Sequence, residues 1–550
     1  MHQAPLAEQP KIGASADALA PIAGSSYRRL TAILLIIAFA GLTIPVVLVE
    51  IPPLLDYPNH LVRLWLISGG AEIPPLSDMY AVSWASAHTN VGIDYLGALF
   101  GRFVPAVALG SFFVLLALML PPLGAVALHR AIFGGVHWWQ IGFVLFAWNA
   151  TLIAGFLNFQ IGIGAALLAA ALETRIARSG PLLRIVARLA ISSLLLLVHF
   201  FALFYYCALL VGIAFGPAIN ALTSWRRLAP RAFAAIVAAG PAAAPALVFV
   251  VLAPSLPGAH VDALGNAPLW DFSVYNKLHV LLSAIATYAL WLDVAFFVAI
   301  AAPLVWAMVA GRIEVHAGLI LAAAGFAVLA LAAPTAVAGT WWIDNRFPLM
   351  AVLALVAGLR PDLNLGSASK VAVAVVLALA VTLRTGWITT IWHDRQADIR
   401  ALHRAVQSVP AGSAVLPLDN IDDSASPSAY PSGRYFHNGH PTHWSFSVLV
   451  IMWRHAFVPN LFWAVGKQPL LVLWPWNEIS FPEDGLLPAR ALLDPTQTPA
   501  HFRSWRERYD YVLLMNADVG RGSDLAALPE LVLERDEGFA RLYRVIKRPR

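Results

Sequence analysis

The chain has 550 residues, of which 59% are hydrophobic and only 12% are charged, and its mean hydropathy is +0.71. Soluble domains carry about 25% charged residues, so the composition excludes an ordinary soluble protein and predicts a membrane protein with many spans. The net charge of +5 does not indicate nucleic-acid binding, because the basic residues fall mostly in short loops between apolar runs, and the single Cys207 excludes a disulfide framework within the chain.

The N-terminal region predicts a polar tail followed by a first membrane helix. Residues 1–29 are polar and are expected to form a disordered cytoplasmic tail. Residues 30–49 contain no charge, and about 20 apolar residues are needed to cross the roughly 30 Å core of a bilayer. This run is too long for the core of a signal peptide, and no small-residue cleavage site follows it.

Residues 30–391 are expected to form a transmembrane domain of about eleven helices. The predicted spans cover residues 30–49, 106–128, 139–157, 160–174, 184–198, 200–217, 232–253, 289–310, 315–334, 346–359 and 370–391. The fifth is short, since residues 185–198 extend only about 21 Å at 1.5 Å per residue. The fifth and sixth are therefore either full spans or a helical hairpin that ends inside the membrane. The sequence has no internal repeat, which argues against a secondary transporter built from duplicated halves.

The basic residues predict the orientation of these spans. With the N-terminus inside, the inner loops contain fourteen basic residues, and the outer loops before residue 392 contain four. The inner set is Lys11, Arg28, Arg29, Arg130, Arg175, Arg178, Arg184, Arg188, Arg226, Arg227, Arg231, Arg312, Arg360 and Lys370. The outer set is Arg63, Arg102, Lys277 and Arg346. Because cytoplasmic loops are enriched in Lys and Arg, residues 392–550 are expected on the outer face of a bacterial inner membrane.

The first long loop, residues 50–105, is much longer than the other loops between spans, and long ordered loops tend to be functional. Residues 57–68 have helical character, and the spacing of Asp56, His60 and Arg63 places them on one helix face. A carboxylate and a guanidinium at this place can supply a general base and a phosphate-binding cation. The alternative is that Asp56 only caps the helix.

Four further residues are candidates for the same site. His88 and Asp94 precede the second span and could complete the site, with or without a divalent metal, although their spacing is not diagnostic of metal ligands. His199 lies at the apex of the fifth and sixth spans, where an ionisable residue is either functional or a histidine at the membrane interface. Arg346 precedes the tenth span and either binds a phosphate or pairs with a neighbouring carboxylate or anchors the interface.

Residues 392–550 predict a small extracytoplasmic α/β domain. A helical pattern over residues 394–407 is followed by runs typical of strands, at residues 414–418, 470–474, 511–515 and 539–545. His437, His440 and His443 recur at every third position, which favours a loop over the active site rather than a zinc site without cysteines. Asp419, Asp422 and Asp423 favour a solvated acidic turn over a cation site.

The order and sidedness of these features resemble the GT-C superfamily, integral-membrane glycosyltransferases that use polyprenyl-phosphate-linked sugars and include protein O-mannosyltransferases and lipid A aminoarabinose transferases. The resemblance is architectural and covers nearly the whole chain. Asp56 matches the place of the family's acidic residue, His199 that of a polar residue from the middle spans, and Arg346 that of a late arginine associated with the lipid phosphate.

The chain also departs from the family pattern. Many members have paired acids, whereas Tyr57 follows Asp56 here. A motif of the His-Pro-Pro type before the second span is absent, and His88, Thr89 and Asn90 stand at that point. The subfamily and the use of a metal are therefore open, and no cofactor is assigned.

The resemblance implies transfer of a sugar from a polyprenyl-phosphate donor to a hydroxyl of an envelope glycan, lipid or protein. Asp56 would deprotonate the acceptor, while Arg346 and His199 would stabilise the departing phosphate. The expected partners are the donor, the acceptor and membrane lipids, with no nucleic acid. The alternatives are a transporter or flippase of a lipid-linked or anionic envelope substrate, and a non-catalytic protein of polysaccharide export.

Overall fold

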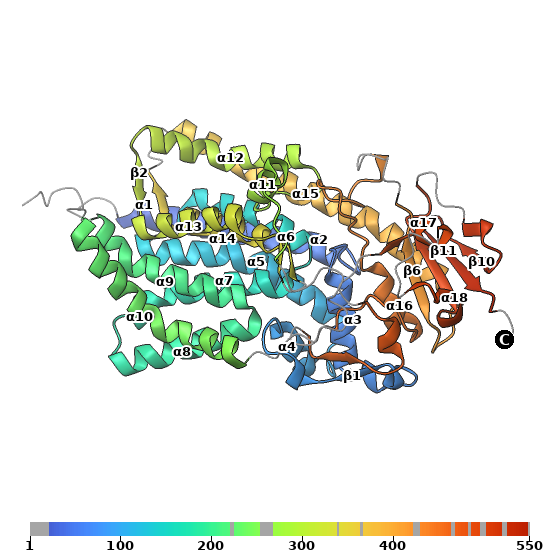
Figure 1. Cartoon of the computed structure of the whole chain (residues 1–550). Helices are drawn as coiled ribbons and strands as arrows, with labels where there is room; N and C mark the ends of the chain where they lie inside the picture. Colours follow the sequence, from blue (N-terminus) through green and yellow to red (C-terminus); the bar gives the residue numbers. More distant parts are fainter. Residues whose placement is uncertain are drawn as a thin grey trace, which may run out of the picture.

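The protein is a bundle of long helices with a small mixed sheet at one end (Figure 1). The computed structural model describes residues 21–220, 225–252, 268–337, 340–362, 367–421, 429–463, 468–481, 486–494, 502–519 and 525–547. The helical bundle and its hydrophobicity make this a polytopic membrane protein, as the composition predicts.

Seven helical segments within the described residues are long and apolar enough to cross a membrane: Arg29–Val47, Ala106–Phe133, Leu157–Ile176, Pro181–Val198, Leu228–Val251, Leu290–Val309 and Ala368–Ala405. The corresponding helices are α1 (Pro21–Gly41) with α2 (Thr43–Val47), α5 (Ala106–Phe133), α7 (Leu157–Ile176), α8 (Pro181–Val198), α10 (Trp225–Leu252), α12 (Leu290–Val309) and α15 (Ser367–Ala405). Shorter apolar stretches are Phe200–Gly216 within α9 (Phe200–Asn220), α13 (Ala317–Ala332) and α14 (Phe347–Ala357). The prediction of about eleven spans thus divides into seven full-length helical segments and several shorter elements.

Two sequence-based boundaries are wrong. The N-terminal tail was expected to be disordered to residue 29, but α1 begins at Pro21, and residues 1–20 lie outside the described part of the chain. The predicted span 139–157 is not one long helix. It consists of a 3-10 helix, η4 (Trp138–Ala147), and one turn of α-helix, α6 (Ala150–Ile153), whose residues are all buried in the protein. An uninterrupted apolar run is compatible with either a lipid-facing span or a buried segment, and here the second applies.

The predicted hairpin is longer than the sequence indicated. Helix α8 begins at Pro181, a residue suited to the first turn of a helix, and has 18 residues. His199 has extended backbone dihedrals between α8 and α9, so the two helices are separate. At 1.5 Å per residue, α8 is about 27 Å long, which is nearly the thickness of a bilayer core.

The first long loop is folded rather than irregular. Its elements are α3 (Tyr57–Ile67), η1 (Gly70–Glu72), η2 (Leu76–Asp78), β1 (Tyr80–Val82), η3 (Trp84–Ser86) and α4 (Gly92–Phe100). It packs on the C-terminal domain. Strand β1 pairs antiparallel with β7 (Leu470–Val472), and Asn59 donates to Ser445 Oγ over 2.8 Å. The predicted strand 470–474 therefore joins this loop instead of the main sheet.

The C-terminal domain contains a five-stranded sheet in the order β10-β11-β9-β6-β8. Its strands are β6 (Val415–Asp419), β8 (Leu487–Pro488), β9 (Tyr511–Met515), β10 (Leu531–Asp536) and β11 (Ala540–Val545). Strand β6 is parallel to β8 and β9, whereas β11 lies between β10 and β9 and is antiparallel to both. The other elements of this domain are η8 (Phe446–Val448), α16 (Leu449–Arg454), η9 (Trp476–Ile479), α17 (Arg490–Leu493), α18 (Trp505–Arg508) and η11 (Leu525–Ala527).

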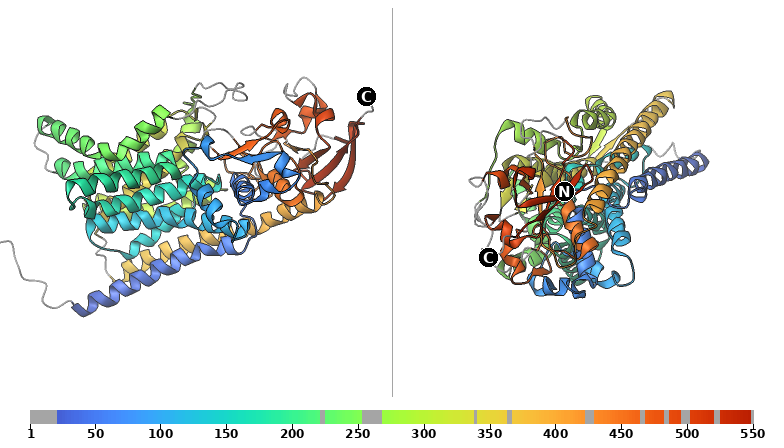
Figure 2. Two further views of the ribbon diagram at one scale, coloured as in Figure 1. Left: turned by 90° about the horizontal axis from the view of Figure 1, so that it is seen from below. Right: turned by 90° about the vertical axis from the view of Figure 1, so that its right-hand side faces the viewer.

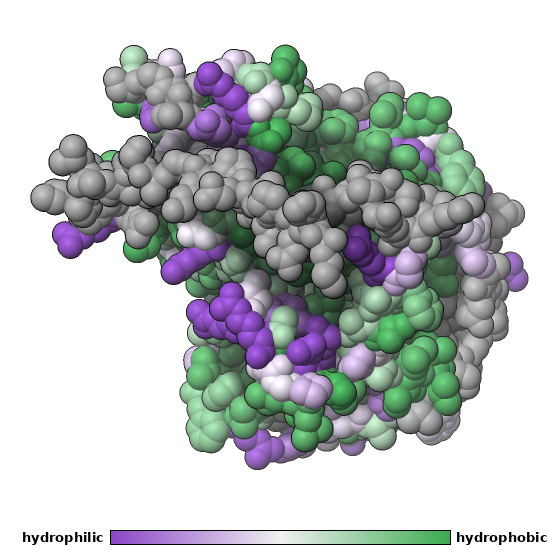
Figure 3. Space-filling view, turned by 90° about the vertical axis from the view of Figure 1, so that its left-hand side faces the viewer, coloured by the Kyte–Doolittle hydropathy of each residue, from purple (hydrophilic) through white to green (hydrophobic). Residues whose placement is uncertain are grey.

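Helix α15 connects the two parts of the molecule. It has 39 residues and runs beside α1 in the bundle before it continues under the C-terminal sheet (Figure 2). The remaining elements near the membrane are α11 (Val274–Leu282), β2 (Ile313–Val315), β3 (Ala336–Val337), β4 (Thr340–Trp341), η6 (Asp344–Arg346) and β5 (Leu359–Pro361). Figure 3 views the end remote from the C-terminal domain, where hydrophilic residues gather in patches between hydrophobic ones.

Candidate functional site

Asp56 stands at the start of α3, where the first long loop leaves the bundle. Its backbone N–H donates to the carbonyl of Ala154 over 3.0 Å, and its half-buried side chain makes no capping hydrogen bond to α3. The contact requires a glycine at position 155, because a Cβ atom there would lie 2.8 Å from the Asp56 nitrogen and the backbone φ is +82°. The chain therefore holds Asp56 against α6 without using its carboxylate as a helix cap.

Arg346 occupies an aromatic enclosure opposite Asp56. Its side chain is buried, and its guanidinium carbon lies 4.7 Å from the ring centroid of Phe156 and 5.3 Å from that of Phe201. Nη1 donates to the carbonyl of Trp341 over 3.1 Å, while Nε has no hydrogen-bond partner among the described residues. The charge of Asp56 stabilises the guanidinium. Arg346 and Asp56 are thus brought together across about 290 residues of chain.

The neighbouring Asp344 also attracts Arg346, but its own ion pair is with another residue. Lys277 Nζ lies 2.9 Å from Asp344 Oδ2, and both side chains are buried. Thr335 donates to the same carboxylate over 3.1 Å. Lys277 was not among the site residues predicted from the sequence. Its position among only four basic residues in the predicted outer loops was a usable signal.

His199 reaches the same place from the break between α8 and α9. Its ring packs against Phe159 and Phe201, and its charge in the protonated form would be opposed by Arg346. The backbone N–H of Phe201 donates to Nδ1 over 3.1 Å, so Nδ1 accepts and Nε2 carries the proton of a neutral ring. His199 therefore presents an N–H donor beside Arg346.

Arg63 does not join this group as a substrate-binding cation. Its guanidinium makes two hydrogen bonds to Asp94, of 2.8 Å from Nε and 3.3 Å from Nη2, and both side chains are fully buried. Nη2 also donates to His60 Nδ1 over 3.0 Å. Burial, together with the charge of Arg63, holds the pKa of His60 well below its ordinary value. These three residues form an internal network that joins α3 to α4.

The other candidate residues lie apart from this site. The side chain of His88 is exposed, whereas Asp94 is buried, so the two do not converge on a metal. Within the described residues no group of three or more His, Cys, Asp or Glu side chains could hold a metal ion. Asp419 is buried and its Oδ1 lies 3.1 Å from His443 Nε2, which makes it part of the domain interior and not a solvated turn. Asp422 and Asp423 lie outside the described residues.

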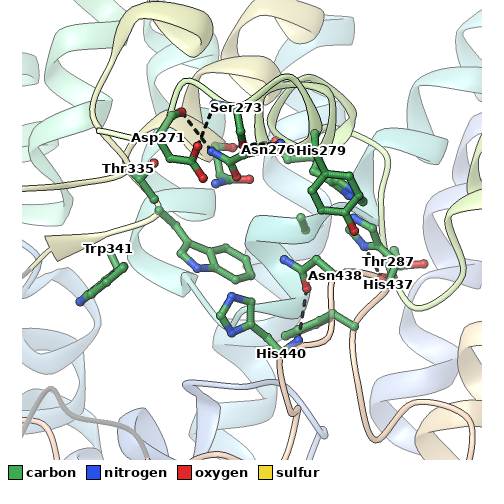
Figure 4. Close-up of a pocket in the computed structure, with 16 residues that line it drawn as sticks. Asp271, Ser273, Asn276, His279, Thr287, Thr335, Trp341, His437, Asn438 and His440 are labelled. Atoms are coloured by element: carbon green, nitrogen blue, oxygen red, sulfur yellow. Dashed lines mark hydrogen bonds between the residues drawn. The ribbon is translucent and has the colours of Figure 1, made fainter. Parts of the chain in front are cut away.

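The loop that contains His437 and His440 covers a cavity of about 250 Å³ beside Arg346. Figure 4 shows Asn438 and His440 of this loop on one side, and Asp271, Ser273 and Asn276 on the other. Both Trp342 and Asn345, which precede Arg346 in the chain, line the cavity. His437 and His440 line this cavity, whereas His443 is buried in the C-terminal domain beside Asp419, and the active site under this loop stays a prediction.

A separate apolar groove of about 400 Å³ lies on the bundle. Helix α11 contributes to both spaces, with His279 in the cavity and Leu281 and Leu282 in the groove. Residues on either side of Arg346 do the same, since Asn345 of η6 lines the cavity and Pro348 of α14 lines the groove. The other groove residues are Ala284, Ile285, Phe297, Ile320, Ala323, Ala324, Ala327, Ala351, Val352 and Leu355. The cavity and the groove are therefore lined by neighbouring segments of the chain but share no lining residue.

A second buried ion pair supports the cavity from inside the bundle. Arg384 Nη2 lies 2.9 Å from Asp293 Oδ1, and both side chains are fully buried. Asp293 accepts hydrogen bonds from Thr287, whose carbonyl lies 3.2 Å from His437 Nδ1. Neither Asp293 nor Arg384 was predicted as a site residue from the sequence. Each interrupts an apolar run of membrane length, which is itself a signal of a buried pair.

No family model, curated protein or solved structure matches this chain. The geometry and chemistry of the site are therefore the basis for the function proposed below.

His437 is expected to make the folding stability of the protein depend on pH. Burial lowers the pKa of His437 to about 4, from an ordinary value near 6.5 in the unfolded chain. Between these values the unfolded state binds the extra proton, so stability is complete above pH 6.5 and falls as the pH decreases toward 4. We expect this group to cost no more than about 1.4 kcal/mol per pH unit. Thermal unfolding of wild type and His437→Gln between pH 7.5 and 4.5 measures it, and equal pH slopes would contradict the assignment.

Proposed function

We propose that the protein is a glycosyltransferase that moves a sugar from a polyprenyl-phosphate-linked donor to a hydroxyl of a cell-envelope acceptor. The reaction would take place at the outer face of a bacterial inner membrane. The observation that carries the proposal is the grouping of Asp56 with Arg346 and His199, which come from three separate parts of the chain. The Arg346 guanidinium lies against the rings of Phe156 and Phe201, the His199 ring packs on Phe201, and the Asp56 N–H donates to Ala154, two residues before Phe156. This combination offers a carboxylate base beside a cation and a neutral N–H donor.

The chemistry required of Asp56 is removal of a proton from the acceptor hydroxyl. Asp56 stands at the first turn of α3 without capping it. Its side chain is half-buried. The acceptor oxygen attacks the anomeric carbon, the bond from that carbon to the phosphate oxygen breaks, and the lipid phosphate leaves with the electron pair.

The departing phosphate needs positive charge and hydrogen-bond donors. Arg346 supplies a guanidinium whose Nε has no partner among the described residues, and aromatic rings exclude water around it. His199 supplies the Nε2–H beside it. Donors held in place before the reaction stabilise charge that develops in the transition state without further rearrangement. The apolar groove lined by residues of α11, α12, α13 and α14 would hold the polyprenyl chain.

Arg346→Gln tests the phosphate assignment. Glutamine retains a hydrogen-bonding side chain but removes the charge, and hydrogen bonds to charged groups contribute about 1.5–3 kcal/mol. We therefore expect the KM for the lipid donor to rise about ten- to a hundredfold. The matched control is Arg102→Gln, an exposed arginine of the first long loop that pairs with Glu72. A donor KM equal to that of wild type in Arg346→Gln would exclude a phosphate at this position.

The direct test of function is incubation of the detergent-purified protein with radiolabelled polyprenyl-phosphate sugars and envelope acceptors. Release of the lipid phosphate together with labelled acceptor is expected. A transporter or flippase of a lipid-linked substrate is the competing function, because a polar cavity and an apolar groove lined by neighbouring segments also suit a lipid in transit. Tight donor binding without cleavage in any acceptor mixture would support the transporter instead.

A further inference from the structure

The cavity beside Arg346 is lined by four parts of the chain. Residues between 271 and 287 around α11 form one wall, Thr335 with Trp341, Trp342 and Asn345 the second, and Phe436 to His440 of the C-terminal domain the third, and Ala150 of α6 completes the lining. Trp342 separates the cavity from the Arg346 enclosure, because its ring contacts Phe156 on one side and Phe436 and His440 on the other. The cavity is therefore a neighbour of the reaction site and not the phosphate position itself.

The side chains that line the cavity combine aromatic rings with hydrogen-bonding groups, three histidines and one carboxylate, that of Asp271. The rings are those of Tyr275, Trp341, Trp342 and Phe436, and the neutral polar groups include the amides of Asn276, Asn345 and Asn438 and the hydroxyls of Ser273, Ser283 and Thr335. No Lys or Arg occurs among its described lining residues. A phosphate or carboxylate would find no cation here and would meet the Asp271 carboxylate, so the lining disfavours an anionic ligand, whereas the amides and Asp271 can bind the hydroxyls of an uncharged one.

Two histidines of the lining each have a buried nitrogen atom without a hydrogen-bond partner among the described residues. His437 Nδ1 lies 3.2 Å from the Thr287 carbonyl, which can only accept, so Nδ1 carries the proton and Nε2 is an acceptor. Neither His437 Nε2 nor His279 Nδ1 has a hydrogen-bond partner among the described residues, although both atoms are buried. Buried polar atoms are nearly always paired, so a ligand that brings hydroxyl groups would satisfy them.

The backbone at Trp342 is also unusual. Its φ is +59°, a left-handed conformation that bulky side chains rarely adopt. Strain of this kind is kept where surrounding structure fixes a functional side chain. Here it holds the indole between the Arg346 enclosure and the cavity.

We propose that this cavity binds one uncharged sugar ring of a reactant, with an aromatic ring under the apolar face of the sugar and amides around its hydroxyls. The assignment rests on the proposed glycosyltransferase function and adds the chemical class of the ligand. Drug-sized ligands occupy sites of roughly 300–1,000 Å³, so about 250 Å³ suits one ring and not an oligosaccharide. The ring belongs either to the donor or to a glycan acceptor.

Saturation-transfer NMR on the full-length protein in detergent tests the site. The probes are methyl glycosides of neutral hexoses and of N-acetylhexosamines, with methyl glucuronide and inorganic phosphate as competitors. The cavity variants are Trp341→Ala and Asn438→Ala, and Trp291→Ala is the matched control, since this exposed tryptophan lies outside the cavity. Asp56→Asn reports separately on the proposed catalysis.

We expect at least one neutral glycoside to bind wild type, Trp291→Ala and Asp56→Asn alike, and to bind both cavity variants at least tenfold more weakly. Binding of no glycoside, unchanged binding in both cavity variants, or displacement by phosphate would each overturn the sugar site. The proposed function fails on a different result, namely donor that is never cleaved. Donor hydrolysis without acceptor identifies the source: variants that hydrolyse normally but fail to transfer locate an acceptor sugar, and variants that lose both locate the donor sugar.

Discussion

Asp56→Asn protein is expected to fold and bind the lipid donor normally, but to transfer sugar about 10²–10⁴-fold more slowly than wild type. Asparagine has the same shape as aspartate and cannot accept the proton of the acceptor hydroxyl. The loss should appear in kcat rather than in the donor KM, because the donor phosphate is assigned to Arg346 and His199. Steady-state transfer with a radiolabelled polyprenyl-phosphate sugar measures both constants.

The control for this experiment is Asp78→Asn. Asp78 is an exposed carboxylate of the same loop, at the end of η2, and has no part in the proposed site. It should transfer sugar at the wild-type rate. If Asp56→Asn also retains wild-type kcat, Asp56 is not the base, and the grouping of charges serves binding or structure alone.

Arg63→Met is expected to destabilise the protein by about 3–5 kcal/mol, because it leaves the carboxylate of Asp94 buried without its cation. The double variant Arg63→Met with Asp94→Val should recover a large part of this loss, since it removes both buried charges. Buried ion pairs are often close to neutral against apolar replacements of similar volume. Thermal unfolding in detergent, followed for both single variants and the double variant, provides the cycle.

This result would separate the phosphate-binding role predicted for Arg63 from the structural role that its contacts indicate. A phosphate-binding arginine would raise the donor KM when replaced and would change stability little. Equal stability of wild type and Arg63→Met, with a raised donor KM, would return Arg63 to the substrate site. The geometry favours the structural role, because both carboxylate oxygens of Asp94 are bonded to the same guanidinium.

Three of the predicted site residues interact in the fold. Asp56, His199 and Arg346 were each selected as an ionisable residue at the end of an apolar run, and Arg346 interacts electrostatically with both of the others. Their role in a reaction stays a prediction. Arg63 was misjudged because helical spacing shows which residues share a face but not what lies opposite. Its partner, Asp94, is 31 residues away on α4.

Other features depended on contacts between distant segments. Strand β7 was predicted as a strand, but nothing in its sequence indicates that it pairs with β1, nearly 400 residues earlier. The cavity was not predicted from the sequence either. Its lining residues come from segments far apart in the chain, and none of these segments has a recognisable motif. Residues 139–157 were wrongly predicted as one span because burial inside a protein and contact with lipid select similar side chains.

The length of α15 has a mechanical consequence. Its 39 residues form a rod of about 58 Å at 1.5 Å per residue, nearly twice the thickness of a bilayer core. Successive residues of a helix are about 100° apart around its axis, so one residue added to or removed from α15 would oppose the β1–β7 pairing that holds the C-terminal domain on the first long loop. The length of α15 and this pairing together set the position of His437 against His279 of α11.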